Sequence, residues 1–164
     1  MSSRFYDNNP IHQRAFLRED GTSPLINVNG SVTPIPFTWT PPAGTVFKLD
    51  EVDIVFTGPG NINNVSNFMN MSTLTNGLMF ETHIDGVVNE VVNLKTNFDL
   101  INQLNTTFEL KLLGTTNVLV GNIKLKRPLV FDGDNSDLMC AVVRDDFSGL
   151  DYSAISVVGV IEIK

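Results

Sequence analysis

The sequence predicts an all-β protein, an antiparallel β-sandwich that most resembles a jelly roll. Segments rich in Val, Ile, Phe and Thr recur with alternating apolar and polar positions, which is the pattern of half-buried strands. Clusters of Gly, Pro, Asn and Asp separate these segments, and strands do not alternate with helices, which argues against an α/β fold. Long strands joined by uneven loops favour a jelly roll among the possible sandwiches.

The first 24 residues are predicted to form an extended N-terminal arm ahead of a single β-sandwich domain, residues 25–164. The arm is polar and shows little periodicity, but a few apolar side chains could anchor it on a neighbouring subunit. These candidate interface residues are Phe5, Tyr6, Phe16 and Leu17. A disordered chain end is the alternative, since termini often lack fixed structure.

Between residues 24 and 42, prolines restrict the strands to short pieces at sheet edges, Leu25–Val28 and Phe37–Thr40. Trp39 is expected to cap the core, although a Trp flanked by prolines could also bind peptide or sugar. Residues 46–56 then alternate clearly. A slip of phase at Asp50-Glu51 indicates a β-bulge, the mark of one extra residue in a strand.

Residues 61–77 are rich in Asn and are predicted to be a loop with one helical turn. The next segment, residues 78–94, is predicted as a hairpin, because Asp85-Gly86 between two alternating runs is a strong two-residue turn signal. Phe98, Ile101 and Leu104 follow at helical spacing, so one or two helical turns are expected over residues 96–104.

Four strands are predicted in the remainder of the chain. They cover residues 107–113, residues 118–126 with Pro128 ending the strand, residues 138–144, and the final run that is dominated by Ile155, Val157, Val158, Val160, Ile161 and Ile163. The end of the chain is therefore expected to be part of a sheet.

The composition indicates one domain and excludes several kinds of partner. A chain of 164 residues is long enough for one core and short for two. The net charge of −7 and the scattered Lys and Arg residues argue against nucleic acid and against an anionic membrane surface. No apolar run approaches the ~20 residues of a membrane span, and the polar start is unlike a signal peptide, so synthesis in a host cytoplasm is expected.

The acidic turn at residues 132–137 is the sharpest candidate for chemistry. Asp132, Asp134 and Asp137 offer closely spaced carboxylates, which suit a hard cation such as calcium. The glycine and glutamate of an EF-hand are missing, however, and a polar turn between strands explains the same residues. These three aspartates are therefore weak metal candidates, and no metal site is predicted.

Other side chains suggest no catalytic or cofactor site. Asp145 and Asp146 are adjacent, so in extended structure they point in opposite directions and cannot act as a paired acid and base. Cys140, the only cysteine, lies in an apolar run and is predicted to be a small buried hydrophobic residue. Two histidines and one cysteine cannot form a standard zinc site without carboxylates. No catalytic residue, cofactor or enzymatic activity is predicted.

Four phrases of the sequence resemble small virion structural proteins of tailed bacteriophages, of the jelly-roll head-decoration or cement type. They are the segments at 38–44 (TWTPPAG), 74–78 (LTNGL), 95–99 (KTNFD) and 144–150 (RDDFSGL). The resemblance implies a homotrimeric sandwich on the capsid surface of a virion, which binds the major capsid protein and stabilises its lattice.

Two other functions remain open from the sequence. A phage tail or baseplate structural protein would have much the same sequence character. A carbohydrate-binding β-sandwich module is suggested by Trp39, Tyr6 and Tyr152 together with the many Asn side chains, although aromatic residues make up only 9% of the chain.

Overall fold

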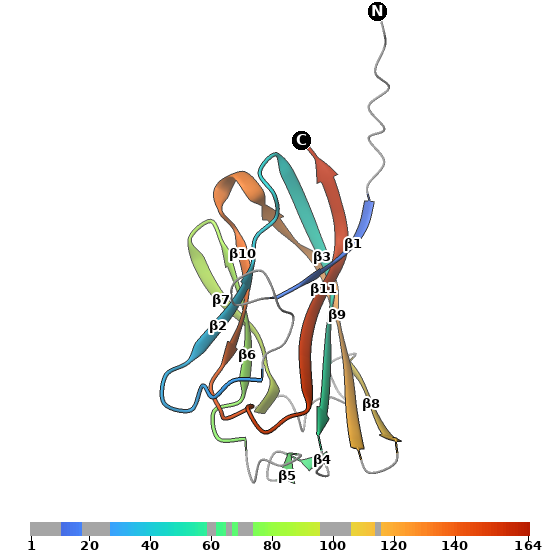
Figure 1. Cartoon of the computed structure of the whole chain (residues 1–164). Helices are drawn as coiled ribbons and strands as arrows, with labels where there is room; N and C mark the ends of the chain where they lie inside the picture. Colours follow the sequence, from blue (N-terminus) through green and yellow to red (C-terminus); the bar gives the residue numbers. More distant parts are fainter. Residues whose placement is uncertain are drawn as a thin grey trace, which may run out of the picture.

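A computed structural model describes residues 11–17, 27–58, 62–64, 67–68, 74–95, 106–113 and 116–164 (Figure 1). These residues confirm the all-β class, because they form two antiparallel sheets that face each other across a shared core. The jelly-roll assignment within this class stays a prediction.

The strands are β1 (Ile11–Phe16), β2 (Ile35–Trp39), β3 (Thr45–Gly58), β4 (Ile62–Asn64), β5 (Asn67–Phe68), β6 (Leu78–Ile84), β7 (Val87–Asn93), β8 (Thr106–Leu113), β9 (Thr116–Asp132), β10 (Leu138–Val143) and β11 (Tyr152–Ile163). The larger sheet has the order β1-β11-β3-β9-β8, and the smaller has the order β2-β10-β6-β7. Strands β4 and β5 pair only with each other.

The core fills the space between the two sheets. The larger sheet contributes side chains such as Phe47, Phe56 and Phe131, and the smaller sheet contributes Phe37 and Met139, all of them fully buried or nearly so. The alternation that predicted the strands therefore reflects one face of each sheet packed against the other. Trp39 lies partly exposed at the margin of this core, edge-on to Phe47 with ring centroids 4.9 Å apart.

The predicted hairpin is confirmed with its two-residue turn. Strands β6 and β7 pair antiparallel, and the turn residues Asp85 and Gly86 have φ values of 51° and 74°. Left-handed backbone at both positions is what a type I′ turn requires, and Asp-Gly tolerates it.

The bulge predicted at Asp50-Glu51 is present, and β9 is also distorted there. On β3, Leu49 pairs with Leu129 but Glu51 pairs with Lys124, so one residue of β3 faces four residues of β9. The prediction that Pro128 ends this strand is wrong, because β9 continues to Asp132. The strand tolerates the proline because residues 125–128 lie outside the paired register.

Two further predictions differ in part from the structure. The segment at residues 61–77, predicted as a loop with a helical turn, contains the two short strands β4 and β5 in its described part; residues 65–66 and 69–73 lie outside the described residues, so the helical turn stays a prediction. Within the predicted arm, residues 11–16 form the edge strand β1, which pairs with β11 from Ile11↔Ile161 to Phe16↔Ser156. The helical turns expected over residues 96–104 lie outside the described residues.

Candidate functional site

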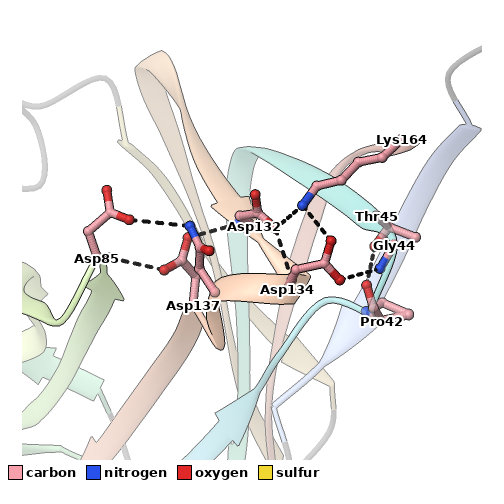
Figure 2. A network of polar contacts seen from close by, with 9 residues as sticks. Pro42, Gly44, Thr45, Asp85, Asp132, Asp134, Asp137 and Lys164 are labelled. Carbon is pink, nitrogen blue, oxygen red and sulfur yellow. Dashed lines mark hydrogen bonds and ion pairs between the residues drawn. The ribbon is translucent and has the colours of Figure 1, made fainter.

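A network of polar contacts joins several turns at the end of the sandwich that is uppermost in Figure 1. We call it the Lys164 network, and Figure 2 shows it from close by. Its members come from the turn before β3, the β6–β7 turn, the short 3-10 helix between β9 and β10, and the end of β11; they are Gly44, Asp85, Asp132, Asp134, Asp137 and Lys164. The network therefore links the two sheets at this end.

The ammonium group of Lys164 lies between two carboxylates. It donates to Asp132 and, at 2.7 Å, to Asp134. These contacts lower the pKa of both carboxyl groups, with smaller help from the backbone amides that each also accepts, and they raise the pKa of Lys164. All three groups are thus ionised over the whole neutral range.

Asp137 occupies the buried side of the same turn. One of its carboxylate oxygens accepts the amide of Asp85 at 3.0 Å, and the other accepts the amide of Asp132 at 2.8 Å. Asp137 is only 3% exposed, so water cannot solvate its carboxylate well, and backbone amides from two separate turns hydrogen-bond to it instead. This residue connects the β6–β7 turn to the β9–β10 turn.

Asp134 connects the 3-10 helix to the turn before β3. Its carboxylate accepts the amide of Gly44 at 2.7 Å, while the amide of Lys164 donates to the carbonyl of Gly44 at 3.0 Å. The helix approaches this turn so closely that a Cβ atom at Gly133 would lie 2.1 Å from the carbonyl oxygen of Pro42. Only glycine fits at position 133 without displacing the backbone.

The three weak metal candidates are thus brought together, and protein donors occupy their oxygens. Asp132 and Asp134 share Lys164, and Asp137 binds two backbone amides. A cation at this turn would have to displace the lysine. The observed arrangement is that of a polar turn braced against its neighbours.

Exposed apolar side chains occur on strands of both sheets at the same end of the molecule. Among the side chains that the structure describes, seven large hydrophobic residues are exposed, and five of them lie on strand segments next to the Lys164 network. We call these five the apolar rim: Ile11, Val87, Val88, Val130 and Ile163. Ile163 is 73% exposed and Ile11 is 61% exposed.

The candidate interface residues of the arm have different outcomes. Phe5 and Tyr6 lie outside the described residues. Phe16 is half-buried on the edge strand β1, and Leu17 is fully buried, with its amide donating to the carbonyl of Ile155. Leu17 therefore belongs to the protein's own core and is closed to a partner in this structure.

The paired carboxylates Asp145 and Asp146 diverge, as expected. Asp145 is buried and accepts the amides of Asn76 and Gly77, whereas Asp146 is exposed and accepts from Ser148. Their contacts are those of turn-forming side chains and do not form a cleft between two acids.

Lys164 is not predictable from local sequence as the partner of the acidic turn. The contact joins residues 32 and 30 positions apart in the sequence, and it depends on β11 ending beside the β9–β10 turn. The sequence shows only that a lysine follows the apolar segment that became β11. The strand order is needed to see that this lysine lies beside the acidic turn.

Comparison with known proteins identifies no relative. No family model matches the chain, and neither a curated protein nor a solved structure matches it. In the part of the chain that the structure describes, helices long and apolar enough to cross a membrane are absent.

Proposed function

We propose that this protein is a non-enzymatic structural protein of a bacteriophage virion, a capsid decoration protein that binds the major capsid protein lattice and stabilises it. The observation that carries this proposal is the apolar rim around the Lys164 network. A rigid sandwich end with exposed apolar side chains is suited to seating on another protein surface.

The network supports this role because it fixes the shape of the surface before binding. Four connected segments from both sheets are held by Asp134, Asp137 and Lys164. A surface that is ordered in advance loses little conformational entropy when it binds, so more of its contact energy appears as affinity.

A tail or baseplate location is the nearest alternative, and it uses the same surface. A carbohydrate-binding module has less support, because Trp39 is partly buried against the core, with its ring centroid 4.9 Å from that of Phe47. A sugar platform needs an aromatic ring face that is free to stack.

The proposal is tested with particles that lack the protein, to which the purified full chain is added back. Wild-type protein should co-sediment with the particles and raise the temperature at which they disrupt. The variants Val130→Asp and Ile163→Asp should lose this binding, because they place a charge within the apolar rim.

Val32→Asp is the matched control, because Val32 is 92% exposed and lies outside the rim. It should bind like the wild-type chain. Absence of the protein from purified virions, or equal binding by rim and control variants, would overturn the proposal. Binding to isolated tails in place of heads would select the tail alternative.

The homotrimer is tested separately by light scattering. Removing residues 1–10 spares β1, whereas removing residues 1–24 also removes an edge strand of the larger sheet. A trimer that dissociates on the shorter truncation would support an arm that contacts a neighbouring subunit. If the full-length and the truncated proteins are all monomers in solution, a trimer could form only on the capsid surface.

A further inference from the structure

A second cluster of chemically active side chains lies on the outer face of the smaller sheet, on the side away from the shared core. Glu81 and His83 alternate on β6, so they share one face, and Cys140 on β10 is the register partner of Glu81. One possible ligand atom from each of Glu81, His83 and Cys140 lies within 4.8 Å of the others.

His83 carries the first sign that this cluster has a ligand. Its Nε2 atom is buried from solvent and has no hydrogen-bond partner among the described residues. The Oε2 atom of Glu81 lies 3.7 Å from it, which is too long for a hydrogen bond. A buried ring nitrogen without a partner costs free energy unless something binds it.

Glu81 is oriented toward the same point. Its Oε1 atom accepts a hydrogen bond from the Arg144 guanidinium at 3.1 Å, which leaves Oε2 as the oxygen that faces His83. An outer hydrogen bond that fixes a carboxylate is the usual support of a metal ligand. The Glu81 side chain is 16% exposed, so it is well sheltered from solvent.

Cys140 supplies the third donor and the preference for a soft metal. It is 4% exposed and packs beside Met79 and Val142, as the sequence predicted for a small apolar residue. Burial, together with the nearby Glu81 carboxylate, raises the pKa of its thiol to about 11. Without a bound metal the thiol is therefore protonated, and the Glu81 carboxylate is paired with the Arg144 guanidinium.

We propose that Glu81, His83 and Cys140 form a binding site for a zinc-type divalent cation. A carboxylate oxygen, an imidazole nitrogen and a thiolate sulfur are all accepted ligands of Zn²⁺, and three protein ligands leave a fourth position for water. A tetrahedral zinc site needs ligand atoms about 3.5 Å apart, so modest side-chain rotations close the cluster.

Binding is coupled to proton release. When the cation binds, the S–H bond of Cys140 breaks, its proton passes to solvent, and the sulfur electron pair forms the bond to the metal. Zinc affinity should therefore rise with pH, and isothermal titration in buffers of different ionisation enthalpy should count the released proton.

The test uses the full-length chain, stripped with a chelator and titrated with Zn²⁺ by calorimetry. Co²⁺ serves as a spectroscopic probe, because a thiolate ligand produces a sulfur-to-metal charge-transfer band. Wild-type protein should bind one equivalent, show this band and gain thermal stability with zinc. His83→Gln and Cys140→Ala should each weaken zinc binding about 10-fold or more, and Cys140→Ala should abolish the band.

His12→Gln is the matched control, because His12 is the other histidine and lies on β1 in the opposite sheet. It should bind zinc like the wild-type chain. Circular dichroism in the presence of chelator verifies that each variant folds. His83→Gln is the safer of the two variants, because His83 is partly exposed whereas Cys140 is buried. Absence of binding, or equal binding by the wild-type chain and His83→Gln, would overturn the proposal.

Discussion

The two ends of the sandwich each contain a buried aspartate, but they differ in the exposed ion pairs beside it. At the uppermost end in Figure 1, Asp132 and Asp134 lie at the surface and share a lysine. At the other end, Asp145 is 5% exposed and accepts only backbone amides through its carboxylate. Each end thus holds a buried carboxylate, Asp137 or Asp145, and the uppermost end adds exposed ion pairs.

Asp145 joins three segments that are distant in sequence. Its carboxylate accepts the amide of Gly77 at 2.7 Å, and its backbone carbonyl accepts the amide of Gly30 at 2.9 Å. Beside it, Phe147 is fully buried and its amide donates to Val28. Water cannot replace these acceptors, whereas it can solvate the ion pairs of the Lys164 network. The contribution of an aspartate to stability therefore depends on what its removal leaves unpaired.

The largest effect is expected at the Asp145 end. Asp145→Ala should lower the free energy of unfolding by about 2–4 kcal/mol, because the buried amide of Gly77 loses its acceptor. Denaturant titration measures the loss. Asp146→Ala is the neighbouring control and should change stability by less than about 1 kcal/mol, since this residue is exposed. Similar losses for the two variants would contradict the comparison.

A smaller effect is expected from the tight approach within the Lys164 network. Gly133→Ala should cost about 2–3 kcal/mol, because the new methyl group would clash with the carbonyl oxygen of Pro42. Gly44→Ala is the matched control: a Cβ there meets nothing within 4 Å, so only its φ of 76° adds strain, about 1 kcal/mol. Thermal unfolding of the two variants separates steric clash from backbone strain, and the reverse order would show that the 3-10 helix can shift away.

The smallest effect is expected from Lys164 itself, and it should depend on pH and salt. The pKa values of Asp132 and Asp134 are lowered from 3.8, so their contribution is present above pH 3.8 and is lost as the pH falls through their folded-state values. The pKa of Lys164 is raised from 10.5, so its contribution is present below pH 10.5 and is lost as the pH rises through the folded-state value.

Lys164→Met should therefore melt slightly below the wild-type chain at neutral pH. The difference should shrink at both pH extremes and in high salt, which screens exposed charges. Differential scanning calorimetry across pH measures it. A difference that persists at 1 M salt would show that Lys164 stabilises this end by packing and not by charge.

Local sequence patterns predicted most of the fold. The Asp85-Gly86 turn, the bulge at Asp50-Glu51 and the β-branched final strand are each encoded within a few residues, so composition and periodicity suffice. Pro128 misled the prediction, because a proline ends a strand only where its amide would be needed in the ladder. The edge position of residues 11–16 could not be predicted, since its partner β11 lies at the other end of the chain.

The candidate sites were less predictable than the fold for the same reason. Asp132, Asp134 and Asp137 were visible as a cluster because they are close in sequence. The cluster of Glu81, His83 and Cys140 exists only because β10 lies beside β6, with Cys140 in register with Glu81. Which side chains of two strands lie side by side depends on how the strands pair, and this pairing cannot be read from a single sequence.

The place of β11 in the larger sheet has a consequence for how the protein is made. β11 lies between β1 and β3, and contacts such as His12 to Gly159 join residues 147 positions apart. While the chain is being synthesised, β1 and one edge of β3 must wait for their common partner. Such long-range pairing slows folding. We therefore expect β1 to stay unpaired in the nascent chain until β11 has emerged from the ribosome.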